Sequence, residues 1–450
     1  MTNSQLHCIK VPLQAQPCDV FTHFHHLTGA IFLDSASDEH VNSRFDIIAI
    51  NPRKWLSVKD AQITLDGHPI KGDVFALMQD ELAALCTDKA PHELPFSGGW
   101  LGYFGYDLGR ILERMPELAH NDIDLAQMQV GLYHDALIFD KAHNEWFYVA
   151  QPDVDSDSGL NQYLSLISAQ PVNETFALTS AWQSNMSYEF YAQQFAKIQE
   201  YLRSGDCYQI NLAQRFCAQY QGCEWQAYQR LRAHNRAPFS AFIRLSDGAI
   251  LSISPERFIE VKNNQVETKP IKGTLPRSTD TQEDAALAEQ LANSPKDRAE
   301  NVMIVDLLRN DLGKVAKPGS VHVPSLFAIE SFPAVHHLVS TVRSELAAGK
   351  TAIDQLRAAF PGGSITGAPK IRAMEIIEEL EPHRRSVYCG SIGYLSACGD
   401  MDTSITIRTL VAHNSKLYCW AGGGIVADSN VELEYQETYH KVNKILPTLE

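Results

Sequence analysis

The chain has 450 residues, 44% hydrophobic and 20% charged, which is typical of a globular protein of two or three domains or of one large body. A formal net charge of −16 argues against a nucleic-acid partner, because phosphate binding depends on accumulated lysine and arginine. The absence of a long apolar run and of a secretory signal, together with nine scattered cysteines without a C-x-x-C pair, predicts a soluble cytoplasmic protein with no membrane segment, zinc site or disulfide framework.

Short apolar strands alternating with turns are predicted from residue 1 to about 150. The glycine-rich run 98–107 does not fit G-x-G-x-x-G, so it indicates closely packed turns and strands rather than a nucleotide loop. A polar stretch at 151–159 predicts a surface connection. We therefore expect an N-terminal subdomain at residues 1–170 and a catalytic domain at 187–450.

The second part combines strands and helices in clusters, which favours an α+β fold over a doubly wound one. Hydrophobic spacing predicts a helix over 187–204. Strands are predicted at 208–216, 239–245, 387–395, 404–412 and 416–421, the last three as an antiparallel meander. Further helices, expected to cover one side of that sheet, are predicted at 295–310, 368–380 and 430–446.

Two residues in this part could carry acid, base or nucleophilic chemistry. Glu256 follows a strand, where partial burial would raise its pKa and suit it to donate a proton; an ion pair with Arg257 or another base is the alternative. Lys272 lies in a strand-like segment that turns at Gly273. Packing would lower its pKa and free the amine as a nucleophile, whereas an exposed lysine would be inert.

Two helices present carboxylates three residues apart. Ser294 can cap the first, which carries Asp297 and Glu300 on one face, with Val302, Val305 and Leu308 turned elsewhere. A capping box at 429–432 starts the second, with Tyr435, Tyr439, Val442 and Leu446 as the packing face and with Glu434 and Glu437 on another side. The two pairs could hold one Mg²⁺, or form solvated faces with Glu437 paired to Lys441.

Several other features suit an anionic substrate. The strand 404–412 places Arg408 on a polar face, where it would grip a carboxylate or point to solvent. Gly422, Gly423 and Gly424 expose backbone amides or form a bulge. The helix N-terminus at Lys370 could also receive an anion. One residue of the pair at 336–337 must point inward, toward substrate or core.

Five segments, taken in order, resemble the chorismate-utilising enzymes: 254–258, 270–274, 298–311, 366–370 and 421–429. The resemblance is dense over 187–450 and looser before it. It implies a fold of two packed antiparallel sheets flanked by helices, a requirement for Mg²⁺, and ammonia supplied by a separate glutamine amidotransferase in a heterodimer.

The same resemblance assigns roles to individual residues. It implies metal ligation by Glu300 and Glu437 with Asp297 and Glu434 in support; relatives often have Glu where Asp297 stands. It implies substrate contacts at Arg408, Tyr388, Gly423, Gly424, His337, Thr366, Gln209 and Thr274. Finally, it implies a tryptophan-like pocket, for which we favour a structural over a regulatory role, at Ser35, Arg44, Phe45, Pro238, Phe239 and Ser240.

Two positions select the reaction within this family. Anthranilate synthases typically carry a small residue where Lys272 stands, and isochorismate synthases carry a lysine base where Gln209 stands. The combination implies amination of chorismate at C4 through a covalent lysine intermediate, leading to 4-aminobenzoate and folate. The alternatives are an anthranilate synthase large subunit and, less favoured, a non-catalytic chorismate-binding subunit.

Overall fold

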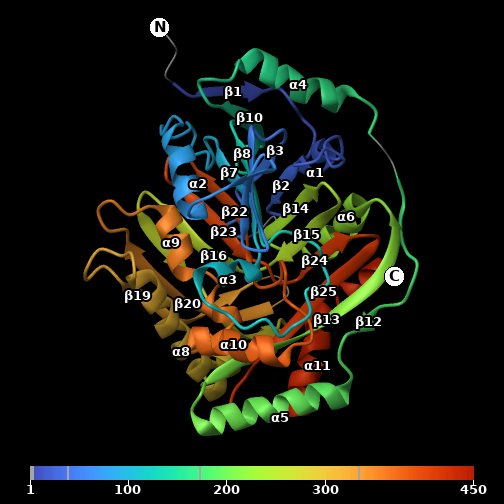
Figure 1. Cartoon of the computed structure of the whole chain (residues 1–450), viewed down its shortest axis with the longest axis vertical. Helices are drawn as coiled ribbons and strands as arrows, with labels where there is room; N and C mark the ends of the chain where they lie inside the picture. Colours follow the sequence, from blue (N-terminus) through green and yellow to red (C-terminus); the bar gives the residue numbers. More distant parts are fainter. Residues whose placement is uncertain (1–4, 38–39, 172–173, 333–334) are drawn as a thin grey trace.

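The structure, a computed structural model, describes residues 5–37, 40–171, 174–332 and 335–450. It consists of two large antiparallel β-sheets with helices around them (Figure 1). None of the described helices combines the length and apolar composition of a transmembrane span.

Strands of the first sheet come from both ends of the chain. Across the sheet they run β1 (His7–Val11), β10 (Glu145–Ala150), β9 (Asp135–Asp140), β3 (Phe45–Ala49), β2 (Ile31–Asp34), β14 (Phe239–Leu245), β15 (Gly248–Ser254), β24 (Thr409–His413), β25 (Lys416–Ile425), β13 (Gln209–Gly222) and β11 (Phe176–Leu178). The short strands β12 (Gln183–Ser184) and β21 (Gly367–Ala368) also pair with β13.

The second sheet is likewise built from both parts of the chain. Its strands run β18 (Ile271–Pro276), β20 (Val335–Glu345), β17 (Gln265–Thr268), β16 (Arg257–Lys262), β23 (Met401–Ile405), β22 (Ser391–Ser396), β7 (Gly99–Phe104), β8 (Met128–Tyr133), β4 (Lys54–Lys59), β5 (Gln62–Leu65) and β6 (His68–Ile70). A further strand, β19 (His322–Ser331), pairs with β20. The run 98–107 is thus strand β7 followed by a turn, as predicted.

The main core lies between the sheets, because one buried cluster joins residues such as Ile250 of β15 and Ile392 of β22. Burial of this apolar surface is the dominant stabilising contribution. A second cluster packs α6 (Glu224–Asn235) against the first sheet through Trp225 and Tyr228. A third cluster packs α5 (Tyr188–Ser204) and α10 (Lys370–Leu380) around β13.

The helices surround this core, and Figure 1 shows α8, α10, α11 and α5 gathered at the end of the sheets away from the N-terminus. The helices are α1 (Pro17–Phe21), α2 (Val74–Ala83), α3 (Gly109–Leu112), α4 (Ser156–Ser168), α5 (Tyr188–Ser204), α6 (Glu224–Asn235), α7 (Thr281–Ala292), α8 (Pro295–Gly313), α9 (Ala352–Ala359), α10 (Lys370–Leu380), α11 (Val431–Val442) and α12 (Leu446–Leu449). Two 3₁₀ turns, η1 (Tyr106–Leu108) and η2 (Gly363–Ile365), complete the set.

The carboxy-terminal strands do not form the predicted meander. Strands β22 and β23 pair in the second sheet, whereas β24 and β25 pair in the first. The run 404–412 is therefore two strands in different sheets, and β22 starts at Ser391, not at 387. Alternation of apolar and polar residues reports only the local extended backbone, so it could not reveal the change of partner.

The predicted helices are present, with corrections to their caps and ends. Ser294 caps α8 by accepting from the Asp297 amide, as predicted. The cap of α11 is Asn430 and not Ser429, and the helix ends at Val442 rather than at 446. The stretch 151–159 is only partly a connection, because Gln151 is buried and α4 starts at Ser156.

Candidate active site

A cavity of about 520 Å³ lies among β18, α8, η2, β25 and α11. Its lining contains most of the residues that the sequence singled out. Those of the predicted set that line it are Glu256, Lys272, Thr274, Asp297, Glu300, His337, Tyr388, Arg408, Gly424, Glu434 and Glu437.

Lys272 reaches this cavity from an irregular stretch of β18. The register of β18 against β20 shifts between Ile271 and Thr274, and such an irregularity re-aims a side chain. Gly273 has φ +84°, and a Cβ there would lie 2.8 Å from Cγ of Asp297, so glycine is required both by conformation and by close approach. Burial lowers the pKa of Lys272, opposed by Glu300 and Glu256. The amine thus has the depressed basicity that a nucleophile needs.

Glu256 lies between β15 and β16 and is 8% exposed. Burial raises its pKa from 4.5 to about 7, opposed first by Lys272 and then by a hydrogen bond to the Ser364 side chain. Lys272 Nζ donates to the Ser364 carbonyl oxygen at 3.2 Å. Arg257, the partner considered as an alternative, instead binds Asp402 at 2.8 Å. Ser364 therefore holds the acid and the amine side by side.

Carboxylates from two helices, α8 and α11, line the cavity. Glu434 is 2% exposed and lies on the buried face of α11, where tyrosines had been predicted to pack. A Cβ at Gly423 would lie 3.1 Å from Glu434 Oε2 and 3.5 Å from Glu437 Oε1, so both carboxylates converge on this glycine. The bare backbone of Gly423 leaves the space between them open.

This set fits a hard cation in its chemistry, because carboxylate oxygens are the ligands that Mg²⁺ prefers. Burial raises the pKa of Glu300 and of Glu434, because loss of water disfavours the charged form of a carboxylate. Two lysines form ion pairs with the carboxylates of α11. Lys441 lies 2.7 Å from Glu437, as the i, i+4 spacing predicted, and Lys296 lies 3.6 Å from Glu434. In the described part of the chain, no three Asp, Glu, His or Cys side chains are grouped closely enough to hold a metal as they stand.

Arg408 does not belong to a strand. It lies between β23 and β24 with φ +51°, at the point where the chain passes from one sheet to the other. This crossover, rather than strand alternation, aims it into the cavity. Burial lowers the pKa of its guanidinium, but arginine stays charged at neutral pH.

Both histidines of the pair are ordered by neighbours. His336 is 2% exposed and its Nε2 lies 3.0 Å from Asp284, whereas His337 Nδ1 shares a hydrogen bond of 2.8 Å with Thr274 in the cavity. Burial lowers the pKa of His337 to about 4, and Arg408 contributes in the same direction. A neutral imidazole therefore faces the site.

The remaining predicted contacts lie at or behind the cavity wall. Tyr388 stacks on Trp420 with ring centroids 6.1 Å apart. Gln209 is 2% exposed on β13, and a Cβ at Gly424 would lie 2.0 Å from its Nε2. The fully buried Thr366 hydroxyl donates to the Gly362 carbonyl oxygen.

Several lining residues had no role assigned from the sequence, and one cation was misplaced. Ser364, Lys296, Trp420 and Asn211 line the cavity without having been assigned a role. A polar residue two positions after Gln209, on the same strand face, was the only signal for Asn211. Lys370, considered for anion binding, is buried in an ion pair of 2.5 Å with Asp311.

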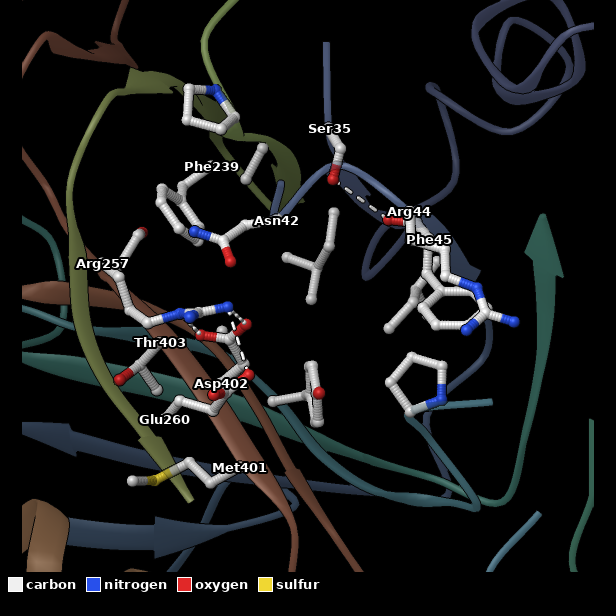
Figure 2. Close-up of a pocket in the computed structure, with 18 of the residues that line it drawn as sticks. Ser35, Asn42, Arg44, Phe45, Phe239, Arg257, Glu260, Met401, Asp402 and Thr403 are labelled. Atoms are coloured by element: carbon white, nitrogen blue, oxygen red, sulfur yellow. Dashed lines mark hydrogen bonds and ion pairs between the residues drawn. The ribbon is translucent and has the colours of Figure 1, made fainter. Parts of the chain in front are cut away.

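A separate cavity of about 270 Å³ collects all six residues of the predicted tryptophan-like pocket. Figure 2 shows Ser35 and Phe45 on one side and Arg257, bound to Asp402 and Glu260, on the other. The Ser35 hydroxyl donates to the Phe45 carbonyl oxygen, and Arg44 binds Asp140 at 3.0 Å. Segments that lie between residues 33 and 404 of the chain thus meet at this cavity.

Comparison with known proteins agrees with this geometry. Residues 29–447 match the chorismate binding enzyme family. The chain is 57% identical to aminodeoxychorismate synthase component 1 of Klebsiella aerogenes, over 98% of this chain and 95% of that protein, and 55% identical to the same component of Salmonella typhimurium, over 96% and 95%. The crystal structure of anthranilate synthase component I from Streptococcus pneumoniae TIGR4 matches with a TM-score of 0.80 and 34% identity, covering 91% of this chain and 93% of that one. This likeness confirms the predicted fold of two antiparallel sheets with flanking helices, and the chain belongs to the chorismate binding enzyme family.

Proposed function

We propose that this chain is the chorismate-aminating component of an aminodeoxychorismate synthase and forms 4-amino-4-deoxychorismate for 4-aminobenzoate and folate synthesis. The observation that carries the proposal is the meeting of the partly buried Lys272 and the buried Glu256 at Ser364. One group is a weakened base and the other a weakened acid, as nucleophilic and acid catalysis require.

The proposed chemistry uses both groups. The amine of Lys272, in its neutral form, attacks C2 of chorismate, both ring double bonds shift, and the C4 hydroxyl leaves as water with the proton of Glu256. The nitrogen of the adduct keeps its extra proton as a secondary ammonium. Ammonia then adds at C4, both double bonds shift back, and the C2–N bond breaks to release the neutral amine of Lys272. The new C4 ammonium gives a proton to Glu256, which restores the acid.

Other residues bind and orient the substrate in this scheme. Arg408 pairs with a substrate carboxylate. Gly424 and Tyr388 line the same cavity, where the Gly424 amide and the Tyr388 side chain contact the substrate. Glu300 and Glu437, supported by Asp297 and Glu434, would hold Mg²⁺, which when bound neutralises and orients the ring carboxylate. His337, neutral and fixed by Thr274, lies beside the ring.

Ammonia comes from a glutamine amidotransferase partner in a cytoplasmic heterodimer. The designation "component 1" of the relatives supports a separate partner. For the cavity at Ser35 and Phe239 we propose a structural rather than a regulatory role. If it binds a ligand, the family resemblance implies that this ligand is tryptophan.

Product analysis tests the proposed function. The chain is incubated with chorismate, MgCl₂ and ammonium chloride, with and without a lyase that forms 4-aminobenzoate, and the products are separated by chromatography. We expect 4-aminobenzoate only when the lyase is present. Anthranilate as the product would identify an anthranilate synthase, and unchanged chorismate would identify a non-catalytic subunit.

A further inference from the structure

A third cavity, of about 380 Å³, adjoins the active site. It shares Pro255, Ile271, His337 and Arg408 with the lining of the active-site cavity, so these four residues lie at the boundary between the two cavities. Its outer rim includes the exposed residues Arg236 and Lys444. We call this space, from the rim at Arg236 and Lys444 to the inner wall at Arg408, the antechamber.

The antechamber is basic in a chain whose net charge is −16. Among its described lining residues the only acid is Glu330, which is bound to Lys269. Arg257 is neutralised by Asp402 and Glu260. The three remaining cations, Arg236, Lys444 and Arg408, have no carboxylate partner within ion-pair distance among the residues that the structure describes.

The two rim cations are placed together by the ends of two helices. Arg236 follows α6 in a left-handed conformation, with φ 45° and ψ 48°. Lys444 follows the end of α11, and Asn235 Nδ2 donates to its carbonyl oxygen at 3.2 Å. This bond links the two helix ends, so residues about two hundred positions apart present their charges at one opening.

The carboxylates of the active site lie outside the antechamber. Asp297, Glu300, Glu434 and Glu437 line the active-site cavity alone, with Lys296 and Lys441 paired to two of them. Their charge is matched by these lysines and, when bound, by Mg²⁺, whereas the antechamber offers unpaired positive charge leading inward to Arg408.

We propose that the antechamber is the entry route of the dianionic substrate, with Arg236 and Lys444 capturing it electrostatically and Arg408 receiving it. The inference rests on the proposed function for the identity of the substrate as a dicarboxylate. Arg236 and Lys444 are positioning residues and contact no reacting atom.

The test compares Arg236→Gln/Lys444→Gln and the reversal Arg236→Glu/Lys444→Glu with the wild type. The matched control is Lys71→Gln/Arg114→Gln, which removes the same charge from exposed residues outside all three cavities. Ammonium-dependent turnover of chorismate is measured at about 20 mM and about 500 mM salt, where the screening length differs severalfold.

At low salt we expect kcat/KM for chorismate to fall about threefold to tenfold in the neutralised variant and further in the reversed one. The values of kcat and of KM for ammonium stay unchanged, the loss disappears at high salt, and the control behaves as wild type. A neutralised variant equal to the control would overturn the proposal. So would a loss that persists at high salt or resides in kcat, because it would indicate contact or structural damage.

Failure of the proposed function has a different signature. If the wild type does not consume chorismate, the function fails, and the entry route is tested by calorimetric titration of chorismate into the same variants at both salt concentrations. The expected pattern is a salt-sensitive loss of affinity in the antechamber variants alone. Equal affinities for wild type, control and antechamber variants would overturn the route.

Discussion

Replacing Glu256 with glutamine should make the protein less active and, above neutral pH, more stable. Burial raises the pKa of Glu256 from 4.5 to about 7, so the folded state keeps a proton that the unfolded state has already released between these pH values. The unfolding free energy therefore falls as pH rises through this window. At 1.36 kcal/mol for each pKa unit, the cost of ionising this buried group between pH 5 and pH 8 is about 2 to 3 kcal/mol.

Glutamine cannot ionise and escapes this cost. Relative to wild type, Glu256→Gln should gain about 2 to 3 kcal/mol of stability on going from pH 5 to pH 8, equivalent to about 2 to 3 °C in Tm for a chain of this length. Scanning calorimetry at both pH values measures it, with the exposed Glu200→Gln as control.

The same variant should lose about 10²- to 10⁴-fold in kcat, because the proton donor is gone. In the wild type, kcat should decline above pH about 7 as Glu256 ionises. A stability difference between variant and wild type that is the same at pH 5 and pH 8 would refute the reasoning, since it would mean that Glu256 is already ionised in the folded protein.

Three further outcomes are expected. Lys272→Ala should abolish any chorismate adduct seen by intact mass spectrometry, and ammonia attacking C2 directly should divert residual product toward anthranilate; an adduct that persists would exclude Lys272 as nucleophile. Glu434→Gln should raise the Mg²⁺ concentration for half-maximal activity at least tenfold, whereas the exposed Glu432→Gln should not; equal shifts would place the metal elsewhere. Gly424→Ala, whose Cβ would lie 2.0 Å from Gln209 Nε2, should lower both Tm and kcat/KM, and an unchanged Tm would show that this side chain moves aside freely.

Local features of the molecule were readable from the sequence because they depend on neighbours in the chain. Ser294 and Pro295 indicated the start of α8, and the spacing of Asp297 and Glu300 indicated one helix face. Gly273 signalled the turn beside Lys272. Capping, i, i+3 spacing and positive φ are all settled within a few residues.

Assembly of the site was decided by tertiary structure. The alternation of apolar and polar residues over 404–412 is the same for one continuous strand as for two strands that join different sheets. The position of Arg408, where the chain crosses from one sheet to the other, is therefore visible only in the tertiary structure. Ser364 contacts both Lys272 and Glu256 because the fold brings its 3₁₀ turn, about a hundred residues away in sequence, next to them. The pKa values of Lys272 and Glu256 depend on the exclusion of water by segments distant along the chain. The sequence alone therefore determined which groups could react, but not which of them would be buried together.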